Sequence, residues 1–133
     1  MTANIIDGKA FANDLVSKLA IKVKLLESKH QFKPGLAVVL VGNNPASEVY
    51  VKNKIRQTEN SGMISIEHRL PESTSQQDLL SLIKDLNSDN SIDGILVQLP
   101  LPKQIDENSV INAISAEKDV DGFNVINAGL LAT

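Results

Sequence analysis

Apolar residues recur along the chain either every three or four positions or in short unbroken runs. The first pattern predicts helices and the second predicts buried strands, and the two alternate along the chain. A first helix is expected to begin at Asp7, a good capping residue, and to run to about Lys29, with apolar residues every three or four positions. These are Phe11, Leu15, Val16, Leu19, Val23 and Leu26. After Pro34 and Gly35, the unbroken apolar run at 36–41 predicts a buried strand.

The segment at 42–62 predicts a short loop followed by a helix. Asn44 is suited to the N-cap and Pro45 to the first helical position, where a missing N–H costs nothing. Gly62 is suited to the position just past the end of the helix. This helix is therefore expected to leave the carboxyl end of the first strand, where ligands bind in open α/β sheets.

The rest of the chain continues the alternation. The predicted elements are a strand at 64–70 that Pro71 ends, a helix at 76–87 capped by Ser73 or Thr74, a buried strand from Gly94, and a helix at about 106–115. The tail at 125–133 carries no strong signal. We expect an α/β fold in three layers (α/β/α) with an open, mainly parallel sheet. A length of 133 residues is typical of one domain.

Composition narrows the classes of function. The net charge is −3 without a basic cluster, which argues against nucleic acid as the main partner. There is no cysteine, and His30 and His68 are isolated, so we expect no metal site. No apolar stretch is long enough to span a membrane, and the N-terminus has neither a basic region nor a long apolar region typical of a secretory signal. The expected location is cytoplasmic.

Tyr50 and Lys54 are four residues apart and so share one face of the second predicted helix. An aromatic ring and an amine would then stand together near the ligand edge of the sheet. Spacing alone also fits a solvated helix surface, which is the commoner origin of such a pair. Two later features bear on this choice.

The first feature is Gln98, which interrupts an apolar run at the end of a buried strand. A buried amide without a partner costs about 1–3 kcal/mol, so a polar partner is expected, either in a site or in the backbone of a neighbouring loop. The second feature is the pair Asp119 and Asp121 in a loop that contains Gly122. An aspartate turn is the simpler explanation of that pair.

Three long motifs together point to one family. The chain resembles the bifunctional methylenetetrahydrofolate dehydrogenase/methenyltetrahydrofolate cyclohydrolase family in G-N-N-P-A-S-E-V-Y-V-K-N-K (42–54), G-I-L-V-Q-L-P-L-P (94–102) and K-D-V-D-G-F-N (118–124). The resemblance covers essentially the whole chain and implies that residues 1–133 are the N-terminal, folate-binding catalytic domain, similar to the N-terminal domain of amino-acid dehydrogenases. It also implies an enzyme of one-carbon metabolism, linked to purine biosynthesis.

The resemblance implies a role for each matching side chain. Tyr50 would stack on the rings of the folate, and Lys54 would be the catalytic lysine of the cyclohydrolase step and would assist the dehydrogenase step. Gln98 would hydrogen-bond Lys54, and Asp121 would bind the amino-pyrimidine edge of the pterin. Val51, Val97 and Leu99 would form the apolar walls of the substrate site, with Ser47 supporting the lysine.

The implied reactions are the oxidation of 5,10-methylenetetrahydrofolate to 5,10-methenyltetrahydrofolate with NADP and its hydrolysis to 10-formyltetrahydrofolate. No two glycines are spaced two apart, so the G-x-G-x-x-G dinucleotide fingerprint is absent from this sequence. We therefore expect NADP to bind mainly to a following Rossmann domain, in an enzyme that is a homodimer.

Two other functions remain open from the sequence. One is a non-catalytic folate-binding or dimerisation module, and the other is the substrate domain of a different dehydrogenase.

Overall fold

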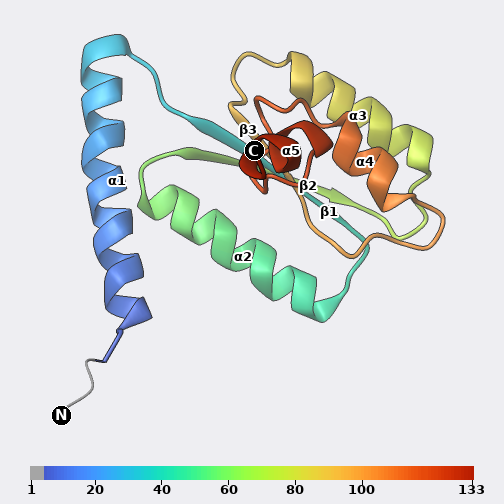
Figure 1. Cartoon of the computed structure of the whole chain (residues 1–133), viewed down its shortest axis with the longest axis horizontal. Coiled ribbons are helices and arrows are strands. Elements are labelled where there is room, and N and C mark those ends of the chain that lie inside the picture. Colours follow the sequence, from blue (N-terminus) through green and yellow to red (C-terminus); the bar gives the residue numbers. More distant parts are fainter. Residues whose placement is uncertain (1–4) are drawn as a thin grey trace.

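The computed structural model describes residues 5–133, and it confirms the predicted α/β fold (Figure 1). The elements are α1 (Gly8–His30), β1 (Gly35–Val41), α2 (Pro45–Asn60), β2 (Ile64–Leu70), α3 (Gln76–Ser88), β3 (Gly94–Val97), α4 (Glu107–Ala113) and α5 (Val125–Leu131). The strands form a parallel sheet in the order β2-β1-β3, so β1 is central.

The two faces of the sheet are covered by different helices. On one face, Val38 and Leu40 of β1 and Leu96 of β3 pack against Val51 of α2. On the other, the alternate strand residues pack against α3 and α4. The members of this second cluster are Ala37, Val39, Val41, Leu79, Ile83, Leu86, Ile92, Ile95, Val97, Ile105, Val110 and Ile114. Because β1 is enclosed on both faces, its sequence is continuously apolar rather than alternating.

The helix caps explain most of the observed boundaries. Asp7 caps α1 by accepting a hydrogen bond from the N–H of Ala10, and Asn44 caps α2, both as predicted. The predicted cap of α3 is wrong, because Ser75 accepts from the N–H of Asp78, whereas the hydroxyl of Thr74 donates to the carbonyl of Pro71. Ser73, Thr74 and Ser75 are consecutive hydroxyl residues, and each is suited to the N-cap position, so the sequence alone does not identify which one caps α3.

Helix α5 was not predicted from the tail. Its N-cap is the buried Asn124, whose side-chain oxygen accepts from the N–H of Ile126 while its amide donates to the carbonyl of Ile114. No residue of α5 itself is buried, so the apolar periodicity that reveals a core-facing helix is missing.

Helix α1 extends away from the sheet and contacts α2 (Figure 1). Its apolar positions repeat as predicted, yet only Val23 is buried within the helix, and Phe11 is 69% exposed. Within residues 5–133, no helix is long and apolar enough to cross a membrane.

The start of β1 is fixed by a close backbone approach. The N–H of Gly35 donates to a carboxylate oxygen of Asp93 at 2.8 Å, and the N–H of Asp93 donates to the carbonyl of Gly35 at 2.8 Å. A Cβ at position 35 would collide with the carbonyl oxygen of Ser91, a backbone atom that cannot turn aside.

We therefore expect Gly35→Ala to lower the free energy of unfolding by about 1–3 kcal/mol, the usual cost of forcing extra volume into a packed site. Urea denaturation measures this loss. The matched control is Gly8→Ala, because a Cβ at position 8 meets no atom. Equal stability of the two variants would contradict the steric argument.

Candidate active site

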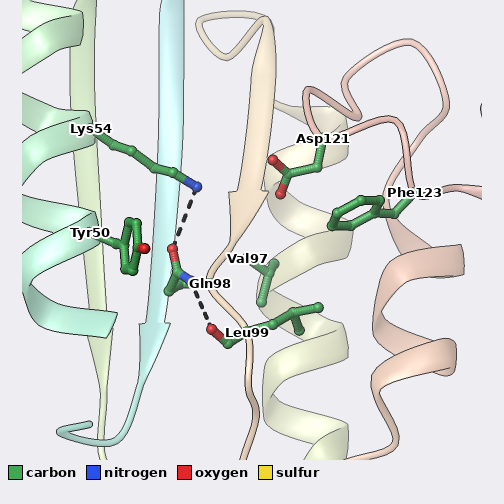
Figure 2. A pocket seen from close by; sticks show the side chains of 7 residues that line it. All are labelled: Tyr50, Lys54, Val97, Gln98, Leu99, Asp121 and Phe123. Atoms are coloured by element: carbon green, nitrogen blue, oxygen red, sulfur yellow. Dashed lines mark hydrogen bonds between the residues drawn. The ribbon is translucent and has the colours of Figure 1, made fainter. Parts of the chain in front are cut away.

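A cleft of about 290 Å³ opens beside the carboxyl end of β3 (Figure 2). Its lining comes from α2, from the end of β3 and from the loop that precedes α5: Tyr50, Lys54, Val97, Gln98, Leu99, Asp121 and Phe123. This volume lies just below the roughly 300–1,000 Å³ found for small-molecule sites. The four side chains that the sequence singled out, Tyr50, Lys54, Gln98 and Asp121, therefore meet in one cleft.

Helix α2 brings two of them. It starts at the loop after β1 and runs back along the sheet, with Val51 turned into the core. Tyr50 and Lys54 project from the side of the helix that faces the cleft (Figure 2). Tyr50 is 63% exposed and Lys54 is half-buried, so both residues are open to a ligand.

Gln98 follows directly on β3 and extends its ladder, because its N–H donates to the carbonyl of Val39 at 2.9 Å. Its side-chain Nε2 donates to the carbonyl of Leu99 at 2.7 Å, which leaves Oε1 directed at Lys54. Lys54 Nζ donates to that oxygen at 3.5 Å, which is longer than a typical hydrogen bond. The amide thus orients the amine while leaving its other protons available.

The loop between α4 and α5 supplies the opposite side of the cleft in Figure 2, through Asp121 and Phe123. Sequence reasoning missed Phe123 as a site residue. Its signal was an aromatic residue two positions from Asp121 in a glycine-containing loop, in a chain with only 3% aromatic residues. Phe123 is 57% exposed, so packing in the core does not explain an aromatic residue at this position.

The apolar and supporting residues divide into three groups. Val97 and Leu99 line the cleft as predicted. Val51 does not line the cleft, because it is 0% exposed and packs in the core between the sheet and α2. The prediction that Val51 forms part of the wall of the substrate site is therefore corrected. Ser47 is buried in the first turn of α2, and its support of Lys54 stays a prediction.

The carboxylate of Asp119 accepts hydrogen bonds from the backbone of the loop that carries Asp121 and Phe123. Partial burial by itself raises the pKa of this carboxyl group. Hydrogen bonds from the N–H of Asn124, the side chain of Asn127 and the N–H of Gly122 outweigh it, so the pKa lies below its usual value. The aspartate turn considered from the sequence therefore exists, and it belongs to Asp119 rather than to Asp121.

The chemistry of the cleft suits a flat, partly polar ligand. Tyr50 and Phe123 offer aromatic faces, Val97 and Leu99 an apolar wall, and the carboxylate of Asp121 two acceptor oxygens. Lys54 adds a group that can donate or accept a proton. In residues 5–133, His, Asp and Glu side chains do not gather in any group able to hold a metal ion.

Comparison with known proteins agrees with this chemistry. A family profile described as "Tetrahydrofolate dehydrogenase/cyclohydrolase, catalytic domain" matches residues 6–121. The chain belongs to this family. The "Bifunctional protein FolD" of Rhodopseudomonas palustris (strain BisB5) is 57% identical over 133 residues, and that of Rhodospirillum centenum is 60% identical over 130 residues.

Solved structures of the family share the fold. The bifunctional FolD enzyme of Campylobacter jejuni is 46% identical over 94% of this chain, with a TM-score of 0.91. The Trypanosoma brucei enzyme, solved with NADP cofactor and an inhibitor, is 33% identical over 98% of this chain, with a TM-score of 0.94. This chain spans 44% and 45% of those two chains, and 45% and 43% of the two FolD relatives named above.

The lowered pKa of Asp119 gives a prediction about acid. Because the pKa is lower in the folded than in the unfolded chain, the hydrogen bonds of this carboxylate stabilise the fold above about pH 3.9, and that contribution is lost as the pH falls through the folded-state pKa. The carboxyl ¹³C signal of Asp119, followed by NMR, should titrate with a midpoint below about 3.9. A midpoint at or above that value would refute the bonding described here.

Proposed function

We propose that this chain is the folate-binding catalytic domain of an enzyme that oxidises 5,10-methylenetetrahydrofolate to 5,10-methenyltetrahydrofolate and hydrolyses the product to 10-formyltetrahydrofolate. The observation that carries the proposal is the pairing of Lys54 with Gln98 in a cleft that Tyr50 and Asp121 also line, in a chain that belongs to the tetrahydrofolate dehydrogenase/cyclohydrolase family.

The cleft residues then have complementary binding roles. Tyr50 stacks on the rings of the folate, which its exposed ring allows. The carboxylate of Asp121 accepts hydrogen bonds from the amino-pyrimidine edge of the pterin. Val97 and Leu99 form the apolar wall between these two groups.

Lys54 carries the proton transfer of the hydrolysis. A water oxygen bonds to the cationic methenyl carbon and loses one proton. The bond from that carbon to N5 then breaks as N5 is protonated, and the remaining hydroxyl proton is released to solvent as the formyl C=O forms on N10. The Lys54 amine receives the proton from the water and returns one to the departing nitrogen. Gln98 holds the amine in place through its Oε1 atom.

The start of α2, the helix that follows the central strand, does not fit the phosphates of NADP. In dinucleotide-binding folds the phosphates bind the free N–H groups at the start of a helix after a glycine-rich turn. Here Asn44 already accepts hydrogen bonds from the N–H groups of Ala46 and Ser47 at the start of α2. We place NADP in a Rossmann domain outside residues 1–133 and assign no step through it to this chain.

The proposal also includes a homodimer, a cytoplasmic location, a place in one-carbon metabolism, and no nucleic-acid partner. These parts extend the expectations from the sequence, and the residues of the cleft do not bear on them. A folate-binding module without catalysis is the competing function, and it differs from the proposal in predicting binding without turnover.

The first test replaces Lys54 in the complete enzyme. Lys54→Gln should lower cyclohydrolase turnover by at least ~10²-fold with folate affinity largely retained, because the amide keeps length and polarity but transfers no proton. Stopped-flow loss of methenyltetrahydrofolate absorbance gives the turnover, and fluorescence titration gives the affinity. The control is Lys52→Gln, on an exposed residue of α2 that does not line the cleft.

Lys54→Arg separates proton transfer from simple charge neutralisation. Arginine keeps the positive charge but holds its proton, with a pKa above ~12, so proton transfer predicts no rescue. Near-normal turnover in Lys54→Arg would overturn the assigned mechanism. Folate binding by the wild-type enzyme without hydrolysis would favour the non-catalytic module.

A further prediction concerns NADP. Residues 1–133 alone should bind no measurable NADP in calorimetry, because the helix start that could hold a phosphate is already capped by Asn44. Micromolar affinity for these residues would show that the cofactor site lies, at least in part, within this chain.

A further inference from the structure

The segment 119–124, here named the 119–124 loop, follows α4 in the chain and leads from a bridge beside β3 into α5. It carries two cleft residues, Asp121 and Phe123. At its start, Asp119 pairs with Ile95 of β3 in a parallel bridge, and the N–H of Ile95 donates to the carbonyl of Lys118 at 2.7 Å. At its end, Asn124 is buried and caps α5. The loop is therefore anchored at both ends.

The middle of the loop has little support of its own. Asp121 and Phe123 are exposed, and within residues 5–133 no hydrogen bond holds the carboxylate of Asp121. Gly122, which separates them, has φ of +71°. The directions of these two side chains consequently depend on the path of the backbone between the anchors.

The carboxylate of Asp119 fixes that path. Oδ1 accepts from the N–H of Gly122 at 3.1 Å, and Oδ2 accepts from the N–H of Asn124 at 2.9 Å and from Nδ2 of Asn127 at 3.0 Å. The side chain of Asn127 also donates to the carbonyl of Ala116 at 2.8 Å, which joins α5 to the segment before the loop. One carboxylate thus connects the β3 edge, the loop and α5.

We propose that Asp119 is a positioning residue for the folate site: its carboxylate holds the 119–124 loop so that Asp121 and Phe123 face the cleft. Phe123 accordingly acts as a second aromatic wall for the folate rings, on the side where Figure 2 shows it, away from Tyr50. The inference rests on the proposed function, because it names residues of the same site. Asp119 does not line the cleft, so its influence on the ligand passes through the loop.

The role requires a carboxylate rather than any polar side chain. Both oxygens of Asp119 accept from N–H donors, three in all. An asparagine has one acceptor oxygen, and its NH₂ group would face an N–H donor whichever way the amide is turned. At least one loop N–H then loses its partner, and the loop gains other conformations.

The test is Asp119→Asn in the complete enzyme, with two readouts. Amide hydrogen exchange should become faster at Gly122 and Asn124, and the KM for methenyltetrahydrofolate should rise between about 10-fold and 10²-fold with a smaller change in kcat, since the displaced groups bind the ground state. The matched control is Asp106→Asn. Asp106 caps α4 by accepting from the N–H of Ser109, and asparagine serves that role equally well.

Gly122→Ala tests the loop independently, in case Asp119→Asn fails to fold. A Cβ at position 122 meets no atom, so any effect comes from the positive φ. The control is Gly129→Ala in α5, where a Cβ also meets nothing and φ is not positive. The KM should rise in Gly122→Ala and stay unchanged in Gly129→Ala.

The two proposals fail in different ways. Wild-type enzyme without cyclohydrolase activity contradicts the proposed function. Active wild type together with an unchanged KM in both Asp119→Asn and Gly122→Ala overturns the positioning role. Unchanged amide exchange in a folded Asp119→Asn variant also overturns it, because the carboxylate then does not order the loop.

Discussion

The double burial of β1 is the constraint on which the rest of this structure depends. The residues Ala37–Val41 are enclosed by α2 on one face and by α3 and α4 on the other, and the strand has a parallel neighbour on each side. A parallel strand cannot return through a tight turn, so the chain must cross the sheet through a helix each time. All three strands therefore end at the same edge, and the segments that leave them meet there.

The cleft residues are positioned in two different ways, some by packing in the core and others by hydrogen bonds within a loop. Tyr50 and Lys54 belong to a helix whose inner face is locked into the core through Val51, and Gln98 continues the ladder of β3. Their mutual positions follow from packing that the whole domain shares. Asp121 and Phe123 depend instead on hydrogen bonds inside one short loop, so core packing does not by itself set this side of the cleft.

The helices and strands with buried faces could be predicted from the sequence, because burial produces the periodicity that predicts them. Helix α5 lacks a buried face, and its only local signal was Asn124, a residue also common in turns. Val51 was misplaced for a related reason. From the sequence, a valine next to Tyr50 could line a ligand site or pack in the core. Successive residues of a helix point in different directions, and in this helix Val51 faces the core while Tyr50 faces the cleft.

The candidate site residues could be identified from the sequence mainly through the family motifs. Spacing placed Tyr50 and Lys54 on one face, and an isolated amide in an apolar run marked Gln98. The meeting of the β3 edge with the 119–124 loop is a long-range contact, and the bridge between Ile95 and Asp119 that creates it has no local sequence signal.

The size of the cleft limits how a folate can occupy it. A volume of about 290 Å³ lies just below the range of sites that enclose a small ligand, and a tetrahydrofolate carries a long tail beyond its ring system. In the proposed function, the carboxylate of Asp121 binds the amino-pyrimidine edge, the ring system occupies the space beside Val97 and Leu99, and the reacting bridge lies toward Lys54. On this proposal the tail extends beyond the cleft, so the cleft residues of this chain recognise mainly the ring system.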